Sequence, residues 1–179
     1  MRHEARQVPS WLIFDVRQNN LMSEPANRKQ LVLLEYLGID IPQGASKAQA
    51  LALIQRAYDD PAKEKRIEEF NERKVDLYPE LFPVELMYCA LERDDPALLK
   101  KALTHGASPE HVNELTSQVP LQIAIRHNAA QCIPVLINAG ANAKRIVYDE
   151  RTSTPATLLE IALRRGKNDC ASALSAGSA

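Results

Sequence analysis

Glycine is scarce in this chain. It accounts for six of the 179 residues, which leaves little material for a loop that cradles a phosphate group. The sequence also lacks the HExxH and GxSxG patterns and any paired-carboxylate signature. These absences give no lead to an enzyme, so we expect no catalytic residues, no cofactor and no metal site.

Cysteine is scarce as well, with Cys89, Cys132 and Cys170 far apart in the sequence and no CxxC pair. An odd number of isolated cysteines favours neither a disulfide framework nor a zinc ribbon. A free cysteine most often behaves as a small apolar core residue. We therefore predict buried free thiols.

Neither a surplus of charge nor a long apolar run is present. Twenty-two basic residues stand against 23 acidic ones, so no global field draws the molecule to nucleic acid or to a membrane surface. No segment approaches the roughly 18 apolar residues needed to span a bilayer. The first residues carry scattered charges around the short apolar run 11–14, unlike a signal peptide. We expect a cytoplasmic protein without a membrane partner.

An internal repeat is present in the C-terminal half. Residues 119–143 read VPLQIAIRHNAAQCIPVLINAGANA, and moving this frame back by 34 residues or forward by 38 aligns small and apolar positions again. Each unit predicts two short helices with one apolar stripe each, joined by a tight turn. Such units bury their apolar faces on one another, and about three are normally needed for stability. The equivalent small residues are Ala90, Ala124 and Ala162 in the first helices and Gly106 and Gly140 after the second ones.

The middle unit closely resembles the ankyrin pattern TPLHLAAxxGHxxIVxLLLxxGADVN. The segments 120–121, 123–124 and 140–142 match it in register. The resemblance covers residues 84–174 and implies a short ankyrin-type helical solenoid of about three repeats. The chain is thus expected to be mainly α, with the ankyrin repeat domain at residues 83–179.

Three departures from the ankyrin pattern lead to predictions of their own. Val119 and Gln122 replace the usual threonine and histidine, so the capping hydrogen bonds of those side chains are expected to be missing. Pro134 is predicted to lie just beyond the first turn of its helix and to bend it. In the third unit, Thr154 and Pro155 suggest an early helix start. Ala162 favours the later alignment instead, with a longer loop at residues 144–153.

The first 82 residues carry no copy of the repeat. Residues 1–26 contain a short β-prone run at 10–16, and residues 27–82 form a helical region. In that region, Asn27 and Ser46 are predicted N-caps of two helices and Gly38 ends the first helix. A charged helix follows Pro61, and we interpret it as solvent-exposed on one face, with a partner-binding or dimerising helix as the alternative.

Residues 30–57 resemble a helix–extended loop–helix module of bacterial and phage proteins. They are also distantly similar to the SAP motif, some members of which bind DNA. A nucleic-acid-associated protein is therefore the alternative functional hypothesis. The basic residues here are too few for the stripe that DNA binding usually requires, so nucleic acid is not the expected partner. They are Arg28, Lys29, Lys47 and Arg56, set against Glu35, Asp40, Asp59 and Asp60.

The ankyrin resemblance also implies where a partner would bind. In such stacks, the residues that follow the inner-helix alanine face a concave groove, and the hairpin tips add further contacts. The candidate partner-binding residues are Glu92, Arg93, Arg126, His127, Arg164 and Arg165 in the groove, with Lys144, Arg145, Tyr148 and Arg151 on the 144–153 loop. The alternative is that they are merely solvated helix ends.

These candidate residues are mostly basic. Arginine recognises carboxylates through a bidentate fork, and Tyr148 could serve as an aromatic anchor. We expect a bacterial protein–protein interaction module that holds an acidic segment of a partner protein through the concave face and the 144–153 loop. Replacing Arg126, Arg164 and Arg165 with Glu should then abolish binding without a large loss of stability. An adaptor, a secreted effector and an immunity-type inhibitor remain open as biological roles.

Overall fold

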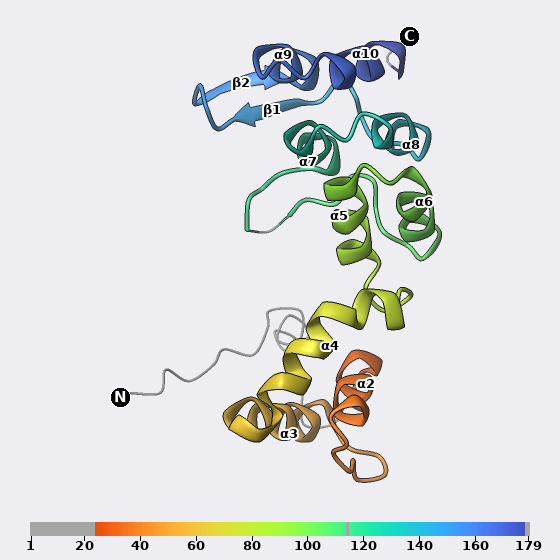
Figure 1. Ribbon diagram of the computed structural model, residues 1–179, viewed down its shortest axis with the longest axis vertical. Helices are drawn as coiled ribbons and strands as arrows, with labels where there is room; N and C mark the ends of the chain where they lie inside the picture. The colour runs from red at the N-terminus through yellow and green to blue at the C-terminus, as the bar shows by residue number, and fades with distance from the viewer. Residues whose placement is uncertain (1–23, 114, 178–179) are drawn as a thin grey trace. The chain divides into compact units, whose positions relative to one another are not determined.

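The computed structural model describes residues 24–113 and 115–177, and this part of the chain is mainly helical, as predicted (Figure 1). It divides between Leu77 and Tyr78 into two compact units. The predicted strand at residues 10–16 lies outside the described residues. Within the described ranges, no helix is long and apolar enough to cross a membrane.

The first unit contains the predicted helical hairpin and the charged helix. Asn27 and Ser46 cap their helices, each accepting a hydrogen bond from the N–H of a glutamine whose side chain bonds back to the cap. Gly38 has a φ of +66°, so it ends the first helix in the left-handed conformation that glycine adopts readily. The elements are α2 (Arg28–Tyr36), α3 (Lys47–Asp59), the 3₁₀ turn η2 (Pro61–Lys63) and α4 (Glu64–Leu77).

The core of the first unit lies where α2 meets α3 and α4. Leu34, Ile54 and Phe70 are completely buried there, and the Phe70 ring centre lies 5.2 Å from that of Tyr36. Burial of these side chains stabilises the unit through the apolar area removed from water. Cationic side chains from η2 and α4 then donate to carbonyl groups at the end of α2, Lys63 to Leu37 and Arg66 to Tyr36.

The second unit contains three successive helix pairs, at the positions predicted from the repeat (Figure 1). The first helices of the pairs pack on one another in order, as do the second helices. Ala90, Ala124 and Ala162 are all completely buried in these first helices, where small side chains let neighbouring helices approach closely. The pairs are α5 (Pro83–Arg93) with α6 (Pro96–Thr104), α7 (Pro120–His127) with α8 (Cys132–Asn138), and α9 (Leu158–Arg164) with α10 (Asn168–Gly177).

Residues in the turns between paired helices connect each pair to the next. Asp94 and Asn128 occupy equivalent positions, and both adopt the left-handed conformation, with φ of 49° and 62°. The Asp94 carboxylate accepts hydrogen bonds from the N–H groups of Gln131 (3.0 Å) and Cys132 (3.2 Å) at the start of α8. Asn128 Oδ1 similarly accepts a long contact, 3.9 Å, from the Cys170 thiol in α10. Each turn thus reaches the second helix of the following pair.

The prediction for α8 was wrong, and the prediction for α7 holds in part, since Val119 makes no side-chain capping hydrogen bond. Pro134 is the third residue of α8 and lies within its first turn, where an N–H has no intrahelical acceptor, so no helical bond is lost. Gln122 provides a capping hydrogen bond in place of the usual histidine, because its Oε1 accepts from the N–H of Val119 at 3.1 Å. The start of α7 is therefore capped by a side chain from within the helix.

The third pair follows the later alignment. Thr157, and not Thr154, caps α9, and it shares a capping box with Glu160. The segment predicted as a loop is mostly a β-hairpin, with β1 (Ile146–Asp149) antiparallel to β2 (Thr154–Thr157). Both strands contact α9. The extra residues of the third repeat thus form this hairpin.

Candidate functional site

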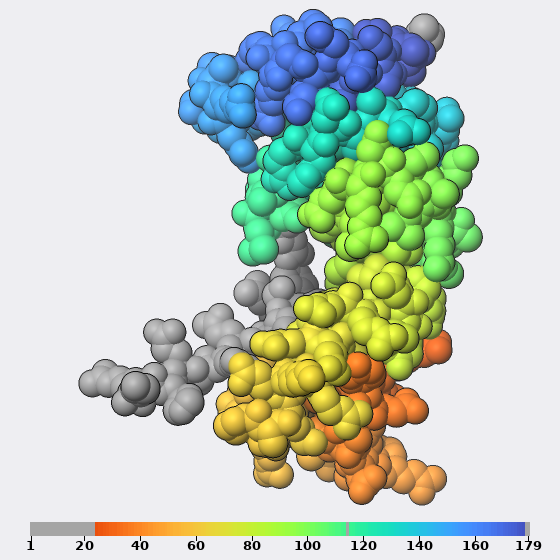
Figure 2. All heavy atoms as spheres, viewed as in Figure 1, coloured from red at the N-terminus to blue at the C-terminus, as the bar shows by residue number. Residues whose placement is uncertain are grey.

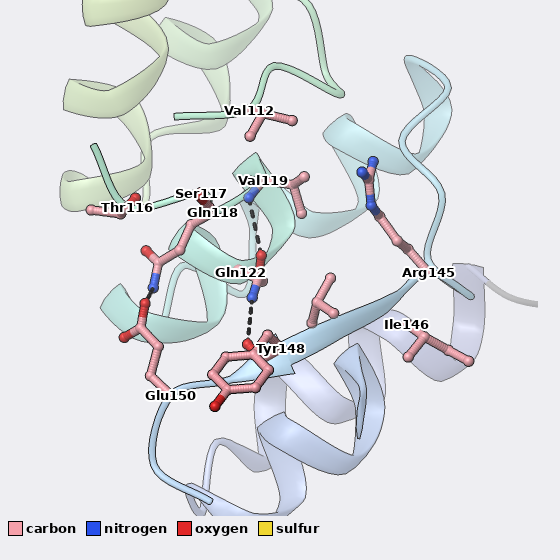
Figure 3. Close-up of a pocket in the computed structure, with 11 residues that line it drawn as sticks. Val112, Thr116, Ser117, Gln118, Val119, Gln122, Arg145, Ile146, Tyr148 and Glu150 are labelled. Atoms are coloured by element: carbon pink, nitrogen blue, oxygen red, sulfur yellow. Dashed lines mark hydrogen bonds between the residues drawn. The ribbon is translucent and has the colours of Figure 1, made fainter. Parts of the chain in front are cut away.

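A pocket of about 280 Å³ lies between the 108–118 segment and strand β1 (Figure 3). We call it the hairpin pocket. The 108–118 segment leads into α7, whose first turn contributes to the lining, while β1 forms the opposite wall. Aliphatic side chains and amide groups share the lining surface, which is typical of a site that takes an apolar group and fixes its orientation. The lining residues that matter most are Val112, Gln118, Val119, Gln122, Val147 and Tyr148.

Two glutamines connect the walls of the hairpin pocket. Gln122 Nε2 donates to the carbonyl oxygen of Tyr148 across a long 3.4 Å, in addition to capping its own helix (Figure 3). Gln118 is almost completely buried; its Nε2 donates to Glu150 at 3.0 Å and its Oε1 accepts from Arg126 at 2.9 Å. These hydrogen bonds join α7, the 108–118 segment and the hairpin into one polar network.

Three exposed apolar side chains line the hairpin pocket, and a fourth, that of Leu115, belongs to the 108–118 segment without lining the pocket. Leu115 is 92% exposed, Ile146 67% and Tyr148 59%, and Val112 in the pocket wall is 43% exposed. The 108–118 segment and the hairpin both project on the same side of the second unit (Figure 2). Clustered exposed apolar groups mark interaction surfaces more often than isolated ones do.

A buried carboxylate fixes the hairpin to α9. Asp149 at the end of β1 is 2% exposed, and its oxygens lie 3.1 Å from Arg165 Nη2 and 3.3 Å from Arg164 Nη1. Burial alone would raise the pKa of Asp149. The hydrogen bond from the Arg151 N–H, the hydrogen bond from Arg165 and the two positive charges outweigh burial and hold the pKa below its ordinary value. The carboxylate therefore stays ionised and paired.

This ion cluster changes the interpretation of the basic groove. Arg164 and Arg165 share the charge of Asp149, and Arg145 forms an ion pair with Glu110. The cluster also undermines the triple change to Glu predicted above as harmless to stability, because Glu at 164 and 165 would leave Asp149 buried among negative charges. As partner-binding residues, these arginines remain a prediction.

The other candidate residues are exposed. Lys144, Tyr148 and Arg151 belong to the hairpin region, and Arg126 and His127 end α7, with 3.3 Å between Arg126 Nε and His127 Nε2. Glu92 and Arg93 are exposed at the end of α5 and do not line the hairpin pocket. Three residues of this region, Val112, Leu115 and Gln118, were not predicted from the sequence. The only indication in the sequence was that Val112 and Leu115 are isolated apolar residues in the otherwise polar 108–118 segment.

The predicted buried thiols are confirmed at two positions. Cys132 and Cys170 are completely buried, and Cys89 is half-buried; none of the three forms a disulfide. Burial, with the nearby Asp94 carboxylate, raises the pKa of Cys132 to about 12. A thiol with such a pKa carries almost no thiolate at neutral pH, so Cys132 is unsuited to act as a nucleophile.

The N-terminal helical hairpin offers a weaker surface. Lys47 of α3 forms an ion pair with Glu24 at 2.7 Å, and Lys63 and Arg66 bond to carbonyl groups of the same unit. Part of its positive charge is therefore used within the unit and not presented to an outside ligand. This arrangement adds nothing in favour of a DNA-binding surface.

Comparisons of the chain with models of protein families, with curated proteins and with solved structures find no match. The functional conclusion must therefore come from the chemistry of the site itself.

Proposed function

We propose that the second unit is an ankyrin-type protein-binding module and that the hairpin pocket is the centre of its binding surface. The spacing of the helix pairs, the buried alanines and the connecting turns at Asp94 and Asn128 support the ankyrin assignment. A stack of this kind is a scaffold, and its partner contacts come from the loops that it positions.

The observation that carries this proposal is the set of exposed apolar side chains on the two segments that border the hairpin pocket. Leu115, Ile146 and Tyr148 are each more than half exposed, and they belong to the two segments that face each other across the pocket. A few anchor residues, tyrosine prominent among them, dominate the energetics of protein interfaces. Lys144 and Arg151 are exposed at the two ends of β1, so the partner is expected to carry acidic residues.

Affinity capture with structure-guided variants tests the proposal. The tagged full chain is used to capture partners from the native host, in parallel with a variant that combines Leu115→Ala and Tyr148→Ala. We expect the double variant to retain at most about a tenth of each specific partner, since anchor residues each contribute on the order of 1–2 kcal/mol. Quantitative mass spectrometry measures the captured partner.

Leu163→Ala is the matched control, because Leu163 is 56% exposed in α9 and belongs to neither of the two segments that border the pocket. It should capture as much partner as the unchanged chain. Both variants should keep the melting temperature within a few degrees, since the side chains removed are exposed. Full capture by the Leu115 and Tyr148 double variant would contradict the proposed site.

A further inference from the structure

The edge of strand β1 specifies what kind of polypeptide the hairpin pocket can hold. We propose that the partner contributes an extended segment that adds to the open edge of β1 as a third strand. The segment places apolar side chains over the hairpin pocket and an acidic residue beside Lys144. This inference rests on the proposed function and names the binding mode at the same site.

The backbone groups of β1 alternate in direction along the strand. In an antiparallel pair, both backbone groups of one residue point toward the partner strand, and those of the next residue point away. The Tyr148 carbonyl points away from β2, because it accepts the Gln122 side chain. The Asp149 carbonyl points into the hairpin, where it accepts the Ser153 N–H at 2.8 Å. By the same alternation, the backbone groups of Ile146 and Tyr148 lie along the outer edge of β1.

The opposite edge of the hairpin is closed to strand addition. Pro155 lies opposite Tyr148 in the register of the two strands. A proline has no N–H, so at this position it leaves a gap in the hydrogen-bonding row along the outer edge of β2. Edge prolines commonly prevent further pairing. The hairpin therefore offers one edge, that of β1, and this edge borders the hairpin pocket.

The outer edge of β1 is apolar, and among the described residues it pairs with no other strand. Natural edge strands avoid aggregation through charged side chains, proline or coverage by another element, whereas β1 exposes Ile146 and Tyr148. The 108–118 segment across the pocket forms no strand in its described residues, and the side-chain amide of Gln122 meets the edge at a long 3.4 Å. A backbone N–H from an added strand can replace that contact with a shorter bond.

The size and charge of the site select a single extended chain. Side-chain links join the two walls near the ends of β1, Gln118 with Glu150 (Figure 3) and Arg145 with Glu110. A volume of about 280 Å³ is small enough to take one extended chain and not a folded element, and that chain must pass over the two links where it leaves the pocket. Since Arg145 is paired, we assign the attraction of an acidic residue at this end to Lys144, which is exposed.

Hydrogen exchange on a peptide complex tests strand addition directly. A displayed library of short random peptides is selected against the full chain, and peptides that the Leu115 and Tyr148 double variant fails to bind are synthesised. On binding, amide exchange at Ile146 and Tyr148 should slow by about tenfold or more, because these N–H groups gain acceptors. The Val147 amide is an internal control, since it points into the hairpin and should change little.

Chain variants separate backbone pairing from side-chain contact. Ile146→Pro removes an edge N–H, whereas Ile146→Ala removes the same side chain and keeps the N–H. The proline variant should bind the peptide about tenfold more weakly than the alanine variant, the loss expected for an intermolecular hydrogen bond and its neighbours. N-methylation of the peptide at alternate residues gives a second readout that leaves the protein unchanged. It should weaken binding at every second position.

Each outcome decides between named alternatives. Strand addition would be overturned if peptides bound at the pocket but amide exchange at Ile146 and Tyr148 did not slow and N-methylation had no alternating effect. The proposed site would then remain intact. If no selected peptide depends on Leu115 and Tyr148, the proposed site itself fails. If the same amides are protected without peptide, in a dimer that forms with rising concentration, the edge belongs to a second copy of this chain.

Discussion

The two units of this chain bury their apolar side chains in different ways. In the first unit, α2 packs on both α3 and α4, and one aromatic ring, that of Phe70, is completely buried. In the second unit, small residues recur at equivalent positions, and each helix pair packs on the next. A unit with one shared core loses stability as a whole, whereas a stack depends on interfaces between nearest neighbours.

The largest expected effect comes from Phe70→Ala in the first unit. Removing a fully buried phenylalanine side chain should lower the free energy of unfolding of that unit by about 3–5 kcal/mol. Amide exchange should therefore accelerate throughout α2 and α3, while α9 should keep its protection. Exposed Glu68 on the same helix supplies the control variant Glu68→Ala, with no comparable effect. Equal loss of protection in α9 would refute the contrast between the units.

Asp149→Asn should have the next largest effect, confined to the hairpin and the third helix pair. The change leaves two arginines without their buried counter-charge and should cost about 3 kcal/mol at neutral pH. Because the folded pKa of Asp149 is lowered, its stabilisation is present above the ordinary value of 3.8 and is lost as pH falls toward the folded pKa. The free energies of unfolding of the unchanged chain and the Asp149→Asn variant, measured from denaturation curves, should thus converge in acid.

Asp169→Asn, an exposed acidic position on α10, is the control for this pH experiment. It should lower the free energy of unfolding by less than about 1 kcal/mol at neutral pH, because Asp169 lies in the first turn of α10 and has no buried partner charge among the described residues to lose. The contrary result is a difference in the free energy of unfolding between the Asp149 variant and the unchanged chain that stays constant from neutral to strongly acidic pH. That result would show that the carboxylate charge is not the source of the stabilisation.

Asp94→Ala tests the coupling between successive helix pairs, with a smaller expected effect. Loss of the carboxylate that caps α8 should cost about 1 kcal/mol and should appear as faster amide exchange in α8. Asp94→Asn should lose less, because asparagine is also a good N-cap and tolerates the left-handed conformation. If exchange accelerated only in α5, to which Asp94 is attached, the connection between the pairs would be unsupported.

Features encoded by nearby residues could be predicted from the sequence. The caps at Asn27 and Ser46 and the stop at Gly38 depend on residues within a few positions, and the repeat frame located the helix pairs because each pair uses the same small and apolar positions. Pro134 was misjudged because helix starts are uncertain by one or two residues, and that uncertainty decides whether a proline breaks a hydrogen bond.

Features that depend on distant partners could not be predicted. The residues of β1 form a strand because they pair with β2, and Pro155 next to Thr154 suggested a helix start instead. Arg164 and Arg165 were correctly placed at a helix end, but nothing local indicates that Asp149, 15 and 16 residues earlier, is buried against them. The hairpin pocket depends on two loops separated by a helix pair, so its walls had no common signal in the sequence.

The hydrogen bonds of Asp94 join two successive helix pairs of the second unit. The carboxylate belongs to the turn of the first pair, and it accepts from N–H groups at the start of α8 in the next pair. An interaction stabilises both of its partners equally, so this contact makes each pair more stable when the other is folded. The first two pairs should therefore open together more often than separately, which limits local unfolding inside the stack.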